Sequence, residues 1–348
     1  MKRTVSILSI LMAVVLMLTM AACTGGATNN TTPNTTATEF VPVKGTLAEG
    51  EFMNVYTLKG PTGMGMAELI ADESDEEDKD YKFTVVSAPE DIAAAIINGD
   101  ADVAACPVNL ASVLYNKTGG RISLLALNTL GVTYIVTNGV EINSIEDLRG
   151  KTIVSAGQGA TPEYILNKLL ADSGLKVGED VNVEFKSEHS DVASLLVAGE
   201  AQIALLPEPQ VTSATVQNPD LKVALDLTKE WETKYGTKLV QGCVIARKDF
   251  ADAYRGTIDE FLEEYKESVE FINTASDEAA QMIVDAGIIP KAPLAKKAIP
   301  NCYITFITGE EMVTLTKDNL KVLYDANDAS VGGKLPNEDF YYISRDID

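Results

Sequence analysis

The stretch that decides the fold runs from Asp91 to Asn109 and reads DIAAAIINGDADVAACPVN. Apolar side chains recur at helical spacing up to Gly99, and a short apolar run then ends at Pro107. One hundred residues later, Asp191 to Gln210 reads DVASLLVAGEAQIALLPEPQ, with its glycine and proline at the same offset. The sequence therefore predicts a helix, a glycine turn and a buried strand, and it contains this unit twice.

Identical residues recur at this single offset without a gap. They are Asp91/Asp191, Ala93/Ala193, Gly99/Gly199, Ala101/Ala201, Ala104/Ala204 and Pro107/Pro207. The strand before each unit aligns as well, with Lys82–Ser87 matching Asn182–Ser187. Chance similarity between two Ala-rich helices is the alternative, and the matching glycine and proline argue against it. Two β-α-β units predict two similar α/β lobes rather than a solenoid of many repeats.

The length, composition and net charge limit the classes of function that the protein can have. A chain of 348 residues with 46% hydrophobic and 23% charged residues is long enough for two globular domains. The net charge of −23 argues against nucleic acid and against an anionic membrane surface, because both need basic patches. A small anionic ligand stays possible, since backbone N–H groups can bind it.

Cysteine and histidine are scarce. The four cysteines show no CxxC spacing, which argues against a disulfide framework. His189 is the one histidine, so neither a histidine-built metal site nor a Ser-His-Asp triad is expected. For His189 itself, a surface or capping role is favoured over metal ligation. We expect no metal and no cofactor.

The N-terminal part reads as a targeting segment. Residues 1–22 hold two basic residues and an apolar run from Val5 to Met20, and Cys23 follows two alanines. This pattern resembles a bacterial lipoprotein signal, which implies cleavage before Cys23 and a lipid (palmitate) on it; an ordinary secretory signal is the alternative. Residues 23–49 are predicted to be a flexible tether, because Thr24 to Thr38 is polar and uncharged.

A glycine-rich turn follows the first predicted strand, Met53–Leu58. The turn GPTGMG spans Gly60–Gly65 and leads into a helix that reaches Ile70. Glycine lets the backbone approach a ligand closely, and a helix start offers N–H donors. The Lys-Ser/Thr pair of a Walker loop is missing, and a plain strand-to-helix turn is the alternative. The candidate ligand-binding residues here are Thr62, Gly63, Met64 and Gly65.

The acidic segment Asp72–Asp80, DESDEEDKD, carries seven acids in nine residues. It lacks the glycine and the spacing of an EF-hand loop. A solvated loop is therefore favoured over a cation site.

The strand of the first repeated unit ends at Pro107, Val108 and Asn109. Ligands of open α/β sheets bind outside the C-terminal ends of strands, so this end is expected beside Pro61–Gly65. A strand over Ile122–Leu127 and another over Tyr134–Thr137 follow. Val108, Asn109 and the hydroxyl of Thr129 are further candidate ligand-binding residues.

The second lobe is expected to repeat this arrangement. Ser144–Asp147 is close to a capping box, and Lys151–Ser155 reads as the first strand of this lobe. Thr161 is predicted as the N-cap of a helix over Glu163–Ala171. The candidate ligand-binding residues in the turn before it are Gly157, Gln158, Gly159 and Thr161. Two helix starts, one per lobe, would then face a common cleft.

Two polar side chains complete the predicted site. Glu208 directly follows the second repeated strand and would face an amine of the ligand, a surface acid being the alternative. Gln241 lies in a strand over Leu239–Ala246 that is expected to cross back to the first lobe. The chain then reads as helical, with apolar residues at helical spacing from Ile258 to Ile272.

Several short motifs in this order resemble one family. After the lipoprotein signal come Leu58–Met64, Asn98–Val103, Ser144–Lys151 before Gly157–Gly159, and Gly332–Pro336 with Asp339–Tyr342. Over about residues 50–345 the chain resembles solute-binding lipoproteins of ABC importers in the nitrate, sulfonate, taurine and thiamine-precursor group.

The resemblance implies an α/β fold of the type II periplasmic-binding-protein class. Each lobe would be a mostly parallel sheet flanked by helices, and two chain segments would form the hinge. Residues 50–138 and 243–348 would make the first lobe and residues 139–242 the second. In the family, the loops that hold the ligand match Thr62–Gly65, Val108–Asn109, Thr129 and Gly157–Thr161.

The resemblance also implies the partners. The protein would be a monomer that captures a small solute between its lobes and docks on an ABC permease with its ATPase. It would lie on the extracytoplasmic face of the cell membrane, held only through the lipid on Cys23, and would not bind nucleic acid. The solute would be anionic or polar, of open identity.

Three classes of function are compatible with such a fold. A binding protein without chemistry agrees with the absence of a catalytic motif, and it is the expectation. Enzymes of the pyrimidine-precursor or menaquinone-pathway type share the fold, but the pyrimidine synthases carry clustered cysteines and several histidines. Here Cys106, Cys243 and Cys302 are isolated. A lipid-anchored sensor without a permease is the third possibility.

Overall fold

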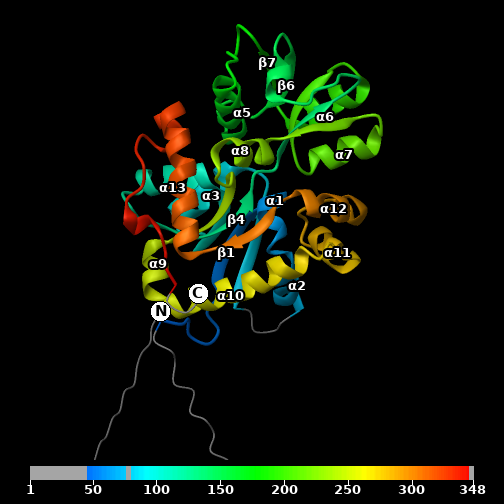
Figure 1. Cartoon of the computed structure of the whole chain (residues 1–348). Helices are drawn as coiled ribbons and strands as arrows, with labels where there is room; N and C mark the ends of the chain where they lie inside the picture. The colour runs from blue at the N-terminus through cyan, green and yellow to red at the C-terminus, as the bar shows by residue number, and fades with distance from the viewer. Residues whose placement is uncertain (1–44, 76–79, 345–348) are drawn as a thin grey trace, which may run out of the picture. The chain divides into compact units, whose positions relative to one another are not determined.

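Two β-sheets flanked by helices make up this computed structural model, which describes residues 45–75 and 80–344 (Figure 1). The predicted signal segment, Cys23 and nearly all of the predicted tether lie outside the described residues. Within the described ranges, no helix is both long and apolar enough to cross a membrane.

The first sheet has six strands in the order β11-β4-β10-β3-β1-β2. β1 is parallel to β2 and β3, whereas β10 is antiparallel to β3 and β4. The strands are β1 Met53–Leu58, β2 Tyr81–Val86, β3 Val103–Pro107, β4 Ile122–Leu130, β10 Val240–Arg247 and β11 Ile304–Ile307. The helices that belong to this part are α1 Pro61–Met64, α2 Ala67–Asp75, α3 Pro89–Asn98, α4 Val108–Lys117, α9 Lys248–Ala253, α10 Arg255–Ile272, α11 Asp277–Asp285, α12 Ala292–Ala298 and α13 Gly309–Ala326.

The second sheet has five strands in the order β7-β6-β8-β5-β9. They are β5 Thr133–Thr137, β6 Thr152–Ala156, β7 Asn182–Lys186, β8 Ile203–Pro207 and β9 Lys222–Asp226. Its helices are α5 Thr161–Asp172, α6 His189–Ala198, α7 Gln210–Gln217 and α8 Leu227–Tyr235. Short 3₁₀ turns are η1 Ile145–Leu148, η2 Ile299–Asn301, η3 Asp328–Val331 and η4 Glu338–Phe340.

The predicted repeat is confirmed and extends to the whole of each sheet. α3 and α6 both end at a glycine in the left-handed conformation, Gly99 with φ 83° and Gly199 with φ 77°, where a residue without Cβ is favoured. The order β2-β1-β3-β10-β4 in one sheet corresponds to β7-β6-β8-β5-β9 in the other. The sequence repeat therefore marks two sheets of equivalent topology, with β11 as an addition to the first.

The chain passes between the sheets twice. β4 ends at Leu130 and β5 begins at Thr133 in the other sheet, while β10 returns after α8. The predicted lobe boundary after residue 138 kept residues 133–137 with the first lobe. Their pairing with β8, from Thr133 opposite Pro207 to Thr137 opposite Ile203, places them in the second sheet instead. The apolar run through β4 and β5 gives no sequence signal for the change of sheet.

Two further details differ from the prediction. α2 continues to Asp75, so the first acids of Asp72–Asp80 belong to a helix; residues 76–79 lie outside the described residues. Ala160, in extended conformation, is the N-cap of α5, and Thr161 is already in the first helical turn. No side chain caps α5, but the Glu163 carboxylate ties the preceding turn to the helix by accepting a hydrogen bond from the Gly159 N–H at 2.5 Å. The predicted capping box at Ser144 and Asp147 is confirmed.

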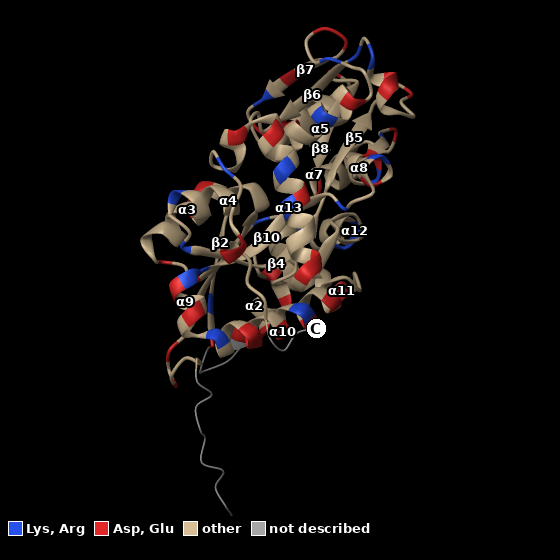
Figure 2. Cartoon of the chain, turned by 60° about the vertical axis from the view of Figure 1, so that its left-hand side comes forward, with Lys and Arg blue, Asp and Glu red and all other residues tan. Residues whose placement is uncertain are grey.

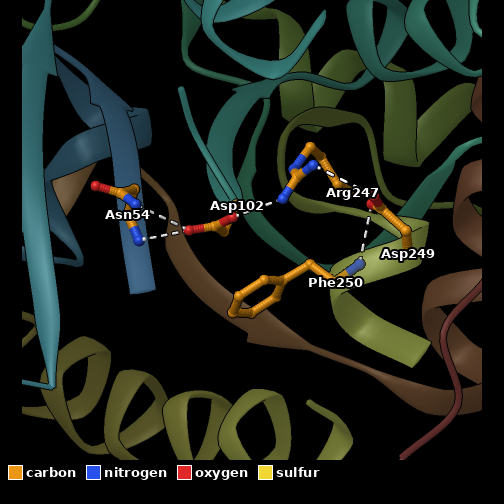
Figure 3. A network of polar contacts seen from close by, with 5 residues as sticks. All are labelled: Asn54, Asp102, Arg247, Asp249 and Phe250. Atoms are coloured by element: carbon orange, nitrogen blue, oxygen red, sulfur yellow. Dashed lines mark hydrogen bonds and ion pairs between the residues drawn. The ribbon is translucent and has the colours of Figure 1, made fainter. Parts of the chain in front are cut away.

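A buried carboxylate fastens three strands of the first sheet (Figure 3). Asp102, at the start of β3, is 7% exposed. Its carboxylate accepts hydrogen bonds from the Asn54 backbone N–H at 2.9 Å and side-chain amide at 3.1 Å. Its other oxygen pairs with Arg247 at 2.8 Å. Because Asn54 lies in β1 and Arg247 ends β10, one side chain holds both neighbours of β3.

We expect Asp102→Ala to lower the free energy of unfolding by about 3 kcal/mol, because it leaves the half-buried Arg247 guanidinium without its buried partner. Urea denaturation measures this. Asp249→Ala is the matched control, since Asp249 also pairs with Arg247 but its side chain is 74% exposed, and such pairs contribute little. Equal losses in the two variants would contradict the role given to Asp102.

Candidate functional site

The C-terminal ends of the repeated strands lie where the chain crosses between the sheets. In the first sheet Pro107 and Thr129 both lie opposite Gly242, two residues into β10. In the second sheet Pro207 lies opposite Thr133, the first residue of β5. The helices α1 and α4 begin at this edge of the first sheet, and α5 and α7 at the same edge of the second. These four helix starts therefore lie at the sheet edges that the crossings join, and a common cleft between them stays a prediction.

α1 is held by its carbonyl groups. The Asn128 side-chain amide donates to the Thr62 carbonyl at 3.0 Å, and the Ser268 hydroxyl donates to the Gly65 carbonyl at 2.7 Å. A Cβ on Gly63 would lie 2.1 Å from the Leu58 carbonyl oxygen, so only glycine fits. The glycines of this turn thus serve close packing, and the anchored carbonyls fix the direction in which the start of α1 points.

Three of the site residues predicted for the first sheet have buried side chains. Met64 and Val108 are fully buried in the core, so only their backbone atoms can reach a solute. Thr129 is also fully buried, and its hydroxyl donates to the Asn128 side-chain oxygen at 3.2 Å. Asn109 is half-buried, and its amide donates to the Ser330 carbonyl at 3.4 Å. The structure therefore brings these residues to one edge, with Asn109 as the most accessible side chain.

The turn before α5 is more open. Gly157 and Gly159 have φ of 71° and 81°, a conformation that favours glycine. Gln158 and Gly159 are exposed, whereas Thr161 is buried. The Glu163 carboxylate already binds the Gly159 N–H. An anionic group that binds at this turn would have to compete with that carboxylate for the donor.

His189 lies closer to this turn than the sequence suggested. β6 and β7 are parallel, with Ala156 opposite Lys186, which brings the start of α6 beside Gly157. The His189 Nε2 lies 3.7 Å from where a Cβ on Gly157 would be. Burial lowers the pKa of His189, so the neutral imidazole is favoured. Its Nδ1 is buried and has no hydrogen-bond partner in the described part of the chain. In the sequence, this position is indicated by the predicted strand just before His189, because that strand pairs with the strand before Gly157.

Glu208 is neither an exposed loop acid nor a free carboxylate. It is 3% exposed, and its two oxygens accept hydrogen bonds from the Thr212 hydroxyl at 2.9 Å and N–H at 3.1 Å. Burial raises the pKa of Glu208 to about 7, because the charged form loses water. The Glu208 N–H donates to the Val132 carbonyl at 2.9 Å, and the Gln241 side-chain oxygen accepts from the Val132 N–H at 3.4 Å. Gln241 through its side chain and Glu208 through its backbone therefore adjoin the first crossing.

Two cavities of the described chain lie away from this edge. One of about 440 Å³ lies between the end of β5 and the start of β9, beside Val140 and Val223. The other, of about 370 Å³, lies between α2 and α10 and is lined by Glu68, Asp72, Glu73, Glu264 and Glu267. Figure 2 marks Asp and Glu positions along α10 in red. No group of His, Cys, Asp and Glu in the described residues is arranged to hold a metal ion.

Two mixed α/β sheets of equivalent topology, each completed by an antiparallel strand after a crossing, form a type II periplasmic-binding-protein fold, as predicted. The family model described as "ABC transporter, phosphonate, periplasmic substrate-binding protein" matches residues 65–290. That is more than half of the chain, and the chain belongs to this family. It is thus a periplasmic substrate-binding protein of the ABC-transporter type.

Solved structures agree on the fold. An ABC transporter protein from Parabacteroides distasonis is 21% identical over 84% of this chain and 99% of its own, with a TM-score of 0.73. The aliphatic sulphonate binding protein SsuA from Escherichia coli is 15% identical over 82% and 92%, with a TM-score of 0.66. The alkanesulfonate-binding protein SsuA from Xanthomonas axonopodis pv. citri, bound to MOPS, is 13% identical over 84% and 96%, with a TM-score of 0.61. A comparison with curated proteins finds no match.

We expect Glu208→Gln to change the pH dependence of stability. The folded state of the native chain holds the Glu208 proton more tightly than the unfolded state does, because the pKa is raised from 4.5 to about 7. Native stability therefore falls as the pH rises between these values, and glutamine removes the loss. The variant should gain up to about 3 kcal/mol relative to the native chain between pH 4.5 and 7.

Urea denaturation at about pH 5 and about pH 8 measures the difference. Glu200→Gln, at an exposed acid beyond α6, is the control for the general effect of removing one charge. A Glu208→Gln profile parallel to that of the native chain would show that the buried carboxylate does not titrate in this range.

Proposed function

We propose that the protein is an extracytoplasmic lipoprotein, anchored through a lipid on Cys23, that captures a small organic anion for an ABC permease. The two sheets with their helices act as lobes, and the lobes meet at the crossings near residues 131–132 and 236–239. The observation that carries this proposal is the set of four helix starts at the joined edges of two equivalent sheets. Closure of the lobes on a solute gives a shape that a permease can recognise.

Phosphonates and sulfonates are the solute classes we favour. The family model supports a phosphonate, and the names of two similar structures support a sulfonate. Both groups carry several oxygen acceptors, which suit the N–H donors at a helix start. The residues we propose for contact are Thr62, Gly63, Met64, Gly65, Val108, Asn109, Thr129, Gly157, Gln158, Gly159, Thr161, Glu208 and Gln241, those with buried side chains acting through the backbone.

The buried Glu208 adds a condition on the solute. A carboxyl group with both oxygens near Thr212 can accept a hydrogen bond from an amine as well. A solute with an amine would therefore be favoured if it reaches the first crossing. We propose binding rather than catalysis, a monomeric protein, and no role for nucleic acid.

A thermal-shift screen of the chain without residues 1–22 tests the proposal. The panel holds alkylphosphonates and alkanesulfonates with and without an amine, nitrate, and pyrimidines. A solute at about a hundred times its dissociation constant should stabilise the protein by about 2.7 kcal/mol. A shift with a phosphonate or sulfonate supports the proposal, whereas a shift only with pyrimidines would contradict the proposed class.

The variant Gly159→Leu tests whether the solute binds at the turn before α5. The leucine side chain would fill the exposed turn before α5, and we expect the affinity for the solute found in the screen to fall by about tenfold or more, equivalent to about 1.4 kcal/mol. Gly174→Leu is the matched control, because Gly174 also has a positive φ of 71° with open space around it, but lies beyond the other end of α5. Equal affinities in the two variants, measured by calorimetry, would contradict the placement.

A further inference from the structure

A short segment of the first part of the chain reaches into the second beside the crossings. η2, Ile299–Asn301, is followed by Cys302 and Tyr303, and β11 then begins at Ile304. The Tyr303 carbonyl accepts a hydrogen bond from the Leu130 N–H at 3.1 Å. Leu130 is the last residue of β4 before the chain crosses. The backbone of Tyr303 is therefore fastened to the first sheet at the point where the first crossing leaves it.

Two tyrosines join this segment to the second sheet in opposite directions. Tyr134 of β5 donates from its hydroxyl to the Asn301 carbonyl at 2.8 Å. Tyr303 donates from its hydroxyl to the Asp226 carboxylate at 2.7 Å. Tyr134 is buried, and the Asp226 side chain is only 12% exposed. The bond to Asp226 is charge-assisted and partly shielded from water, which makes it the stronger of the two.

The backbone of Tyr303 is held in an unfavourable conformation. Its φ is 45°, in the left-handed region that an aromatic residue rarely adopts. Its ring packs against the buried cluster of the second sheet that contains Tyr134, Val136 and Leu206. Such a conformation persists only where the surroundings fix it. Here the carbonyl, the ring and the hydroxyl are all fixed, and they are fixed by different sheets.

Asp226 links the hydrogen bond of Tyr303 to α8 and to the first crossing. Its second oxygen caps α8 by accepting from the Thr228 N–H at 3.0 Å. The Thr228 hydroxyl donates in turn to the Gly131 carbonyl in the first crossing at 2.7 Å. A Cβ on Gly131 would lie 2.4 Å from that hydroxyl oxygen, so the crossing is tightly packed. The hydrogen bond of Tyr303 thus ends on the residue that orders both α8 and the crossing.

We propose that Tyr303 and Asp226 form a noncovalent connection between the two sheets, which acts with the two covalent crossings as the pivot for movement of the lobes. Both are positioning residues that do not contact the solute. The contacts adjoin the crossings, where a rotation displaces atoms least, so they are kept while the lobes open and close. The inference rests on the proposed function only in that the lobes move.

Hydrogen exchange followed by mass spectrometry on the chain without residues 1–22 tests the pivot without any solute. The local reporters are the amides of Leu130, Gly131 and Glu208, which are hydrogen-bonded at the crossing. Asn138 and Arg247, at the far ends of β5 and β10, report on each sheet as a whole. In Tyr303→Phe we expect exchange at the reporters to rise by about tenfold, equivalent to about 1.4 kcal/mol, with Asn138 and Arg247 unchanged.

Matched variants separate the pivot from a general loss of stability. Asp226→Asn keeps an oxygen that can cap α8 but replaces the charged acceptor for Tyr303 with a neutral amide, which removes the charge-assisted bond, so it should give a local increase at the same reporters. The double variant should add little, because both changes break one bond. Tyr164→Phe removes another hydroxyl contact between the two parts of the chain, the bond from Asn327 at 3.0 Å, and should leave the reporters unchanged.

Two results would overturn the proposal. One is exchange that rises equally at the crossing and at Asn138 and Arg247, which means that Tyr303 only stabilises the fold. The other is additive effects of Tyr303→Phe and Asp226→Asn, which means that the two residues act separately. Neither readout depends on a solute, so a failure here is distinguishable from a failure of the solute screen.

Discussion

The structure depends on one kind of strand pairing, made once in each sheet. β10 lies antiparallel on β3 and β5 lies antiparallel on β8, and each of these added strands adjoins a crossing. The pairing requires the crossings to lie at the edge where β3 and β8 end, because antiparallel neighbours begin where the others finish. The helix starts that follow β3 and β8 are then brought to the crossings without any further interaction. Carboxylate contacts such as that of Asp102 at the opposite edge fasten the pairing.

The electrostatic character of the proposed site is local rather than global. The chain carries a net charge of −23, and even the Gly159 N–H is occupied by the Glu163 carboxylate. A long-range field would therefore not attract an anion; the donors of the backbone have to act at short range, where they count most. The Glu163 carboxylate stays on the chain when a solute takes its donor, so a bound anion adds negative charge beside it. This repulsion has to be offset by well-placed donors, which favours discrimination over strength.

Periodicity, glycine and proline are local signals that the two units share, and they predicted the repeat and most of the strands, though not β11. The fold was implied by the resemblance to a known family. The sequence could not predict the change of sheet between β4 and β5, since both strands are equally apolar and only the pairing of Thr133 with Pro207 distinguishes them. It also could not predict which side chains at the edge are buried: Met64 and Thr129 belong to the core through contacts with distant α10 and β10. The position of His189 beside Gly157 was not predicted, because it arises from the pairing of β6 with β7.

The two glycine turns, before α1 and before α5, have equivalent places in the repeat but different structural roles. Gly63 and Gly65 are required because the Leu58 carbonyl and α10 leave no room for a Cβ, and neither has a positive φ. Gly159 has open space around it, and a Cβ on Gly157 would make only ordinary contacts with Ala160 and His189, so both glycines are favoured by their positive φ alone. The first turn is therefore a rigid surface set by packing, whereas the second can adapt by backbone rotation at low cost. If a solute binds between them, the first side sets the position and the second adjusts to it, so variation in specificity within this fold should concentrate in the turn before α5.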